Sequence, residues 1–142
     1  MAMNIDVSFP GGKRVDARVG DFVVRTDQPP KFGGDGSAVA PFDLFLASLA
    51  TCAGTYVLGF CQARNLSTEG LEMRLVVAEE DPATKLPVRI RIELHLPALF
   101  PAHLLAAVVR AAESCKVKKT IAAQPLIEVA LASAHAAIAH AS

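Results

Sequence analysis

The stretch PFDLFLASLATC, residues 41–52, predicts the central helix of the protein. Pro41 suits the first turn of a helix, where its missing N–H costs nothing. The pattern continues to Arg64 and Asn65, and asparagine favours a left-handed helix cap. From residue 41 onward, apolar side chains recur every three to four positions, at Phe42, Phe45, Leu46, Leu49, Ala53, Tyr56 and Phe60.

This helix is apolar enough to raise the question of a membrane span. No charged residue occurs from 44 to 62, and a run of that length can cross a bilayer core of about 30 Å. Small and polar residues interrupt the run, however, and no tryptophan or lysine anchors its ends. We therefore expect a buried helix and no membrane span. A helix without charge on any side must be buried on every side. One chain of this length has little material to enclose it, so we expect a homodimer that packs this helix against its twin or against the other subunit's sheet.

Composition excludes several functional classes. The chain has 142 residues, so we expect one domain over 1–142. Its 14 basic and 14 acidic residues cancel, which argues against nucleic-acid binding and against a polybasic membrane patch. The first residues, MAMNIDVSFPGGKR, lack the features of a signal peptide. We therefore expect a cytoplasmic protein.

The flanking segments predict a mixed α/β (α+β) fold. Alternating apolar residues from 5 to 24 predict a meander of three short strands, and 71–80 with 86–96 predict a β-hairpin with one solvated face. We expect a second helix over 101–114, a helical turn over 116–124, a final strand over 125–132, and a frayed or disordered tail over 133–142. GGDG, residues 33–36, predicts a flexible connecting loop, with a lid over the site as the alternative.

Three cysteines are the candidate chemical groups: Cys52, Cys61 and Cys115. Free cysteine is often only a small buried hydrophobe, and this packing role is our expectation for Cys61. No two ligands have the close spacing typical of a zinc site, so we expect no metal. The spacing of Cys52 and Cys115 does not by itself say whether the fold brings them together.

Two segments resemble the OsmC/Ohr family, the osmotically inducible and organic-hydroperoxide-resistance proteins. They are GGDGSAVAPFDLFLASLATC and CKVKKTI. The residues that carry the resemblance are Pro41, Asp43, Leu46, Leu49, Cys52, Cys115, Val117 and Thr120. The order of the expected elements also fits this family.

The resemblance implies an intertwined homodimer that reduces organic hydroperoxides. Cys52 would attack the peroxide as a thiolate, and Cys115 would resolve the resulting sulfenic acid to a disulfide. An external dithiol would then reduce the pair, without a bound cofactor. An arginine would stabilise the thiolate. Arg14 is the candidate, with Arg18 and Arg25 as alternatives.

Some positions differ from the family pattern. The glutamate that follows the helix-opening proline in the organic-hydroperoxide branch is Phe42 here, and the acid, Asp43, comes one residue later. A shift of one residue turns a side chain by about 100°. Asp43 therefore either holds an arginine or only favours the helix start electrostatically. Lys116 stands where many relatives have proline.

An apolar wall of Phe42, Phe45 and Phe60 would suit an alkyl or lipid hydroperoxide. The alternative function is a non-catalytic protein on the same fold, which binds a hydrophobic small molecule at the dimer interface.

Overall fold

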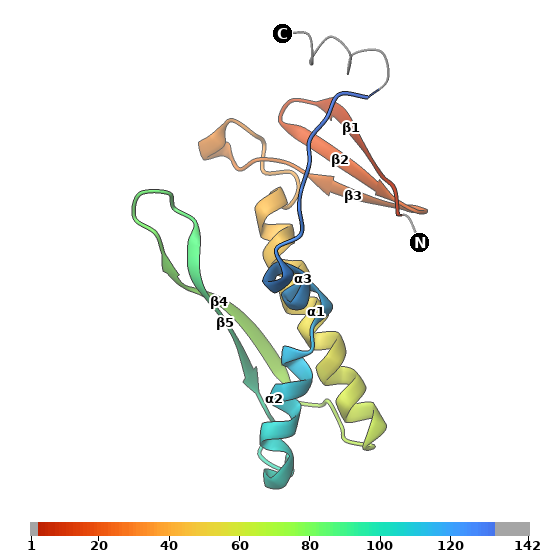
Figure 1. Ribbon diagram of the computed structural model, residues 1–142, viewed down its shortest axis with the longest axis vertical. Helices are drawn as coiled ribbons and strands as arrows, with labels where there is room; N and C mark the ends of the chain where they lie inside the picture. The colour runs from red at the N-terminus through yellow and green to blue at the C-terminus, as the bar shows by residue number, and fades with distance from the viewer. Residues whose placement is uncertain (1–2, 133–142) are drawn as a thin grey trace.

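The computed structural model describes residues 3–132 and contains two antiparallel sheets and three α-helices (Figure 1). The first sheet has the order β1-β2-β3, and β4 with β5 forms the hairpin. Short 3-10 turns occur at Pro30–Phe32 and Ala102–Leu104. The elements are β1 (Ile5–Gly11), β2 (Arg14–Val19), β3 (Phe22–Thr26), α1 (Pro41–Ala63), β4 (Glu72–Glu80), β5 (Pro87–His95), α2 (Leu105–Glu113) and α3 (Lys116–Ala123).

Helix α1 is the axis of the molecule. It begins at Pro41 and ends at Ala63, and Asn65 adopts the predicted left-handed conformation with a φ of 54°. In Figure 1 the hairpin and α2 lie along its lower part, and α3 lies against its middle. The three-stranded sheet lies beyond its N-terminal end.

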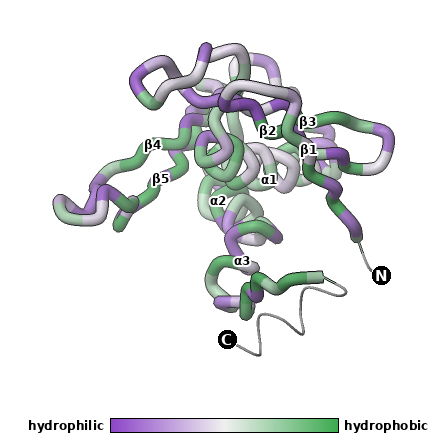
Figure 2. The backbone as a smooth tube through the Cα atoms, turned by 90° about the horizontal axis from the view of Figure 1, so that it is seen from above, coloured by the Kyte–Doolittle hydropathy of each residue, from purple (hydrophilic) through white to green (hydrophobic). Residues whose placement is uncertain are grey.

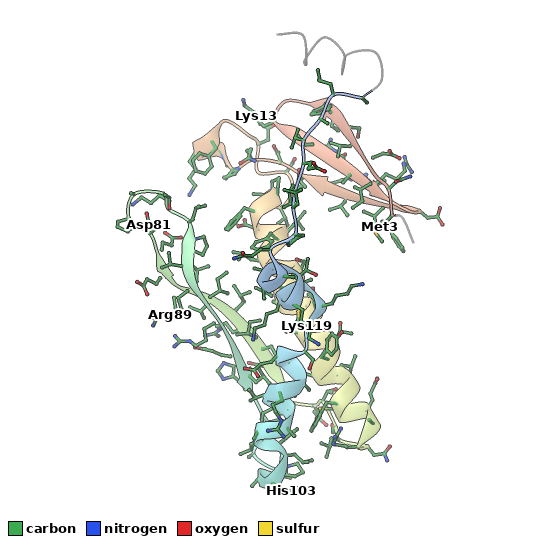
Figure 3. All side chains as sticks on the ribbon, viewed as in Figure 1. Met3, Lys13, Asp81, Arg89, His103 and Lys119 are labelled. Carbon is green, nitrogen blue, oxygen red and sulfur yellow. The ribbon has the colours of Figure 1, made fainter. Side chains whose placement is uncertain are left out.

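The core forms between one face of α1, helix α2 and the hairpin. Side chains of the hairpin fill the space toward the helices (Figure 3), because apolar residues alternate along its strands and share one face. The buried apolar residues are Leu49, Ala53, Val57, Phe60 and Cys61 of α1, Val108 and Ala112 of α2, and Cys115.

Much of α1 is not covered by this single chain. It is the one helix in residues 3–132 that is long and apolar enough to cross a membrane, and only 28% of its apolar window is buried. Core helices of soluble proteins can be equally long and apolar. The predicted all-round burial is therefore not achieved within one copy of the chain.

Hydrogen bonds to Asp27 connect the two ends of the loop before α1. The carboxylate of Asp27, which is 1% exposed, accepts hydrogen bonds from the N–H of Gln28 at 2.7 Å and from the N–H and hydroxyl of Ser37 at 3.0 and 2.6 Å. These bonds hold the pKa of Asp27 below its usual value, that from the Ser37 hydroxyl most strongly. These bonds join the two ends of the segment around 33–36, and the expected flexibility of that segment stays a prediction.

The C-terminal part also departs from the predictions. The expected helical turn is a helix of eight residues, α3, and the expected second helix splits into a 3-10 turn and α2. The expected final strand over 125–132 is absent from the described chain, because a strand needs a neighbouring edge for its backbone groups. The predicted tail, 133–142, lies outside the described residues. Figure 2 shows the apolar character of the segment that follows α3.

Candidate active site

Cys52 lies in the middle of α1, three residues after Leu49 on the side of the helix that meets α3. Its side chain is partly exposed and packs against the buried core. Helix periodicity explains the position, because residues three and four apart share a helix face. Cys52 is thus the cysteine of the three that solvent reaches, since Cys61 and Cys115 are buried.

Cys115 caps the N-terminus of α3. Its thiol is 1% exposed and donates a hydrogen bond to the Leu49 carbonyl of α1, with 3.8 Å between sulfur and oxygen. The sulfur also accepts a hydrogen bond from the backbone N–H of Lys118 at 3.4 Å. These contacts fasten the first turn of α3 to the turn of α1 that precedes Cys52.

The two cysteines are neighbours, although 63 residues separate them in sequence. The neighbouring Cys115 side chain helps to lower the pKa of Cys52. The largest cause of that lowering is the backbone N–H of Val117, and burial opposes it. The N–H and positive charge of Lys116 contribute further. A thiolate is stabilised by hydrogen bonds and by positive charge in this way.

Arg14 does not act on Cys52 within this chain. Its guanidinium pairs with Asp16 at 2.7 Å, two residues along the same face of β2. Asp16 is 8% exposed, and its other carboxylate oxygen has no hydrogen-bond partner in the described chain. The alternatives Arg18 and Arg25 also lie in this sheet, on β2 and β3. The carboxylate that holds Arg14 is thus Asp16.

Asp43 is exposed in the first turn of α1. None of the ion pairs found among residues 3–132 includes it. Its position is the one where a negative charge stabilises a helix N-terminus. In the described chain, Asp43 therefore lies at the helix start and forms no ion pair with an arginine.

The three candidate phenylalanines do not form one wall in a single chain. The rings of Phe42 and Phe45 lie 5.7 Å apart near the start of α1. Phe60 lies about four turns further along the helix than Phe45, where the Arg64 guanidinium stacks on its ring at 3.7 Å. The structure brings together Phe42 and Phe45 only.

Cys61 is a fully buried thiol next to this arginine. Burial raises its pKa, and the Arg64 charge opposes that effect. It is a member of the apolar core, as the sequence predicts. Among residues 3–132 no group of three or more histidine, cysteine or acidic side chains is arranged to hold a metal ion.

An apolar groove of about 400 Å³ lies between α1, the hairpin strand β5 and helices α2 and α3. Leu49, which contacts Cys115 through its carbonyl, forms part of its wall. Charged side chains at its edge come from Arg91, Glu113 and Lys118. Lys118, whose backbone N–H bonds to the Cys115 sulfur, also lines the groove.

Sequence reasoning missed the groups that lower the pKa of Cys52. The backbone N–H groups of Lys116 and Val117 carry no side-chain signal, and only the position of a helix start at 116 could have indicated them. It also missed Asp16, although the alternation Arg14, Asp16 on one strand places both on the same face.

A comparison with protein families matches residues 34–130 to the family described as OsmC-like protein. No curated protein matches the sequence significantly.

Solved structures share the fold. A protein of Psychrobacter arcticus 273-4, assigned to the osmotic stress and detoxification response, superposes with a TM-score of 0.71 at 20% identity, over 84% of this chain and 89% of that one. The organic hydroperoxide resistance protein OsmC of Legionella pneumophila gives 0.55 at 21% identity, over 85% and 89%. A Vibrio cholerae protein assigned to organic hydroperoxide resistance, with captopril in one of its active sites, gives 0.51 at 17%, over 92% and 90%. At these identities the likeness concerns the fold alone.

Proposed function

Because the chain belongs to the OsmC-like protein family, we propose that it is a thiol-dependent peroxidase that reduces organic hydroperoxides. The observation that carries the proposal is the contact between Cys52 and Cys115, two thiols far apart in sequence, of which the exposed one has a lowered pKa. Some relatives of the fold, such as the Legionella pneumophila protein, are organic hydroperoxide resistance proteins.

The reaction balances with these two thiols and an external dithiol. The Cys52 thiolate attacks the terminal peroxide oxygen, so that an S–O bond forms and the O–O bond breaks. The alkoxide takes a proton and leaves as the alcohol, and Cys52 is left as a sulfenic acid. Cys115 attacks that sulfur and expels water, which forms the disulfide. A dithiol reductant then exchanges with the disulfide and restores both thiols. The reducing cytoplasm supplies such dithiols.

We place the alkyl or aryl part of the substrate against apolar surface next to the cysteines. Phe42 and Phe45 lie on the N-terminal side of Cys52, and the groove at Leu49 lies beside Cys115. Burial of an alkyl chain stabilises binding by about 0.8 kcal/mol for each methylene group. Hydrogen peroxide, which has no such group, should therefore be the poorer substrate.

We propose further that the active form is a homodimer. One copy leaves most of α1 uncovered. It also leaves apolar residues exposed on β1 and in the segment after α3, namely Ile5, Val7, Phe9, Leu126, Ile127 and Val129. Apolar surface of this extent is typical of an interface. Arg14 and Asp43 would then meet Cys52 only across subunits. Sedimentation as a monomer at micromolar concentration would refute the dimer.

The test of the enzyme uses purified protein, cumene hydroperoxide and a dithiol reductant. The parent protein should consume peroxide, Cys52→Ser should lose this activity, and Cys61→Ser is the matched control that should keep it. If Cys52→Ser consumes peroxide as fast as the parent protein, the peroxidase proposal fails.

The second candidate function is non-catalytic binding of a hydrophobic small molecule, which the groove beside Leu49 favours. It predicts that the parent protein binds such a molecule but consumes no peroxide. The peroxide assay therefore separates the two functions.

A further inference from the structure

The segment that follows α3 has the pattern of a strand, but it has no partner strand in the described chain. Its sequence is PLIEVALA, residues 125–132, and proline is tolerated as the first residue of a strand. The alternate residues Ile127, Val129 and Leu131 are large, apolar and exposed, Val129 to 98%. In an extended chain Glu128 points to the opposite face. Within residues 3–132 no backbone hydrogen bond involves this segment, so its backbone groups require the edge of another strand.

The hairpin offers a free edge beside an apolar groove. Strand β5 pairs only with β4 in the described chain, which leaves the backbone groups of its other edge open to a further strand. The groove of about 400 Å³ is lined by Ile90, Arg91 and Ile92 of β5. These consecutive side chains point to both faces of the strand, so the groove extends along the free edge. Its opposite wall includes Leu49 of α1 and Ile121 of α3.

Length and charge favour β5 over the other free edges. Strand β5 has nine residues, close to the length of the segment, and its solvated face carries Arg89 and Arg91, which are 70% and 60% exposed. Each contacts a glutamate of the hairpin, and a guanidinium has donors for a further carboxylate. An added strand with its large apolar residues in the groove places Glu128 on this arginine face, where opposite charges attract. By contrast, β4 ends in Glu79 and Glu80, β3 has five residues, and β1 contains a proline.

We infer that residues 125–132 add as a strand to β5 of a second copy of the chain and fill its groove. In Figures 1 and 2 the segment leaves α3 in a direction away from the hairpin of its own chain, so the free edge that it meets is that of the partner. Two copies make this contact reciprocally. The inference rests on the proposed homodimer and specifies its interface. With the strand in the groove, Phe42 and Phe45 remain as the apolar surface for a substrate.

Alternate residues of the segment provide matched variants. Val129→Asp places a charge in the groove, whereas Leu126→Asp places it on the solvated face. Both side chains are exposed in one copy, to 98% and 84%, so neither change should disturb the fold of a single chain. In sedimentation equilibrium Val129→Asp should raise the dissociation constant of the dimer about a hundredfold. Leu126→Asp should raise it less than about threefold.

A photocrosslinker identifies the place of the segment directly. Val129 is replaced by p-benzoylphenylalanine in isotope-labelled protein, which is allowed to exchange subunits with unlabelled parent protein and is then irradiated. Digestion and mass spectrometry should find the labelled segment joined to an unlabelled peptide that contains residues 90–94 or Ile121. This readout does not require that Val129→Asp stays folded.

The possible failures are distinguishable. A parent protein that sediments as a monomer at micromolar concentration would overturn both the homodimer and this inference. A dimer that Val129→Asp leaves intact, with cross-links outside the groove, would overturn the inference alone; this result is expected if a small molecule fills the groove. Cross-links confined to one subunit would also overturn it and assign the groove to the segment of the same chain. The peroxidase proposal is tested separately by Cys52→Ser.

Discussion

The substitution Gly34→Ala tests the ordered loop that leads into α1. A β-carbon built at Gly34 would lie 1.9 Å from the backbone oxygen of Gln28 and 2.9 Å from a carboxylate oxygen of Asp27. The Gln28 oxygen accepts a hydrogen bond from the Gly36 N–H at 3.0 Å, and this Asp27 oxygen accepts one from the Gln28 N–H at 2.7 Å. Neither can move without loss of those hydrogen bonds, since the closer one is backbone. The alanine must therefore displace one side of the loop.

The expected cost is large for an exchange of glycine for alanine. Overpacking of a fixed structure typically costs about 1–3 kcal/mol, and a clash with backbone should reach the upper end of that range. A loss of about 3 kcal/mol is a substantial part of the 5–15 kcal/mol that stabilises a typical domain. For a chain of this length it lowers the Tm by about 10 °C.

The assay is thermal unfolding followed by circular dichroism, with Gly54→Ala as the matched control. A β-carbon at Gly54 would meet only the sulfur of Met73 at 3.7 Å, an ordinary contact, and alanine is the better helix former by about 1 kcal/mol. Gly54→Ala should therefore keep or raise the Tm. If Gly34→Ala unfolds within about 2 °C of the parent protein, the loop is not held as described.

Other perturbations test the core, the loop carboxylate and the thiols. Val108→Ala should cost about 1–3 kcal/mol in chemical denaturation because Val108 is fully buried, whereas Val109→Ala at its exposed neighbour should cost less than about 0.5 kcal/mol; equal costs would contradict the described packing. Hydrogen bonds from Ser37 hold the pKa of Asp27 below 3.8, so its contribution to stability is present above that value and is lost as pH falls through the lower folded-state pKa. Asp27→Asn should therefore flatten the decline of the Tm in acid, and an undiminished decline would refute this role. Iodoacetamide at neutral pH should label Cys52 before Cys61, whose pKa is raised by burial; the reverse order, read from the labelled peptides, would contradict the assignment of the exposed thiol.

Periodicity in the sequence predicted the main elements well. The three-to-four spacing from Phe42 to Phe60 and the alternation around Ile90 are local signals, and α1 and β5 appear where they predict. The expected final strand failed for a physical reason. An apolar, alternating segment becomes a strand only when another edge accepts its backbone hydrogen bonds, and no local pattern says which edge that is.

The site was predictable only in part. The resemblance to a family paired Cys52 with Cys115, and the fold brings the two side chains together. The partners of the expected Arg14 and Asp43 could not be predicted, because a sequence does not say which carboxylate a guanidinium meets in space. The largest cause of the lowered Cys52 pKa also escaped prediction, since it is the backbone N–H of Val117 and every residue other than proline possesses such a group.

The most direct test of the account is the fate of the two sulfurs when the fully reduced protein receives one equivalent of cumene hydroperoxide. Digestion under non-reducing conditions and mass spectrometry then identify the products. The account predicts a peptide pair joined by a Cys52–Cys115 disulfide, formed together with one equivalent of the alcohol. Cys52 recovered as a free thiol, or as a sulfinic acid with Cys115 still reduced, would contradict it.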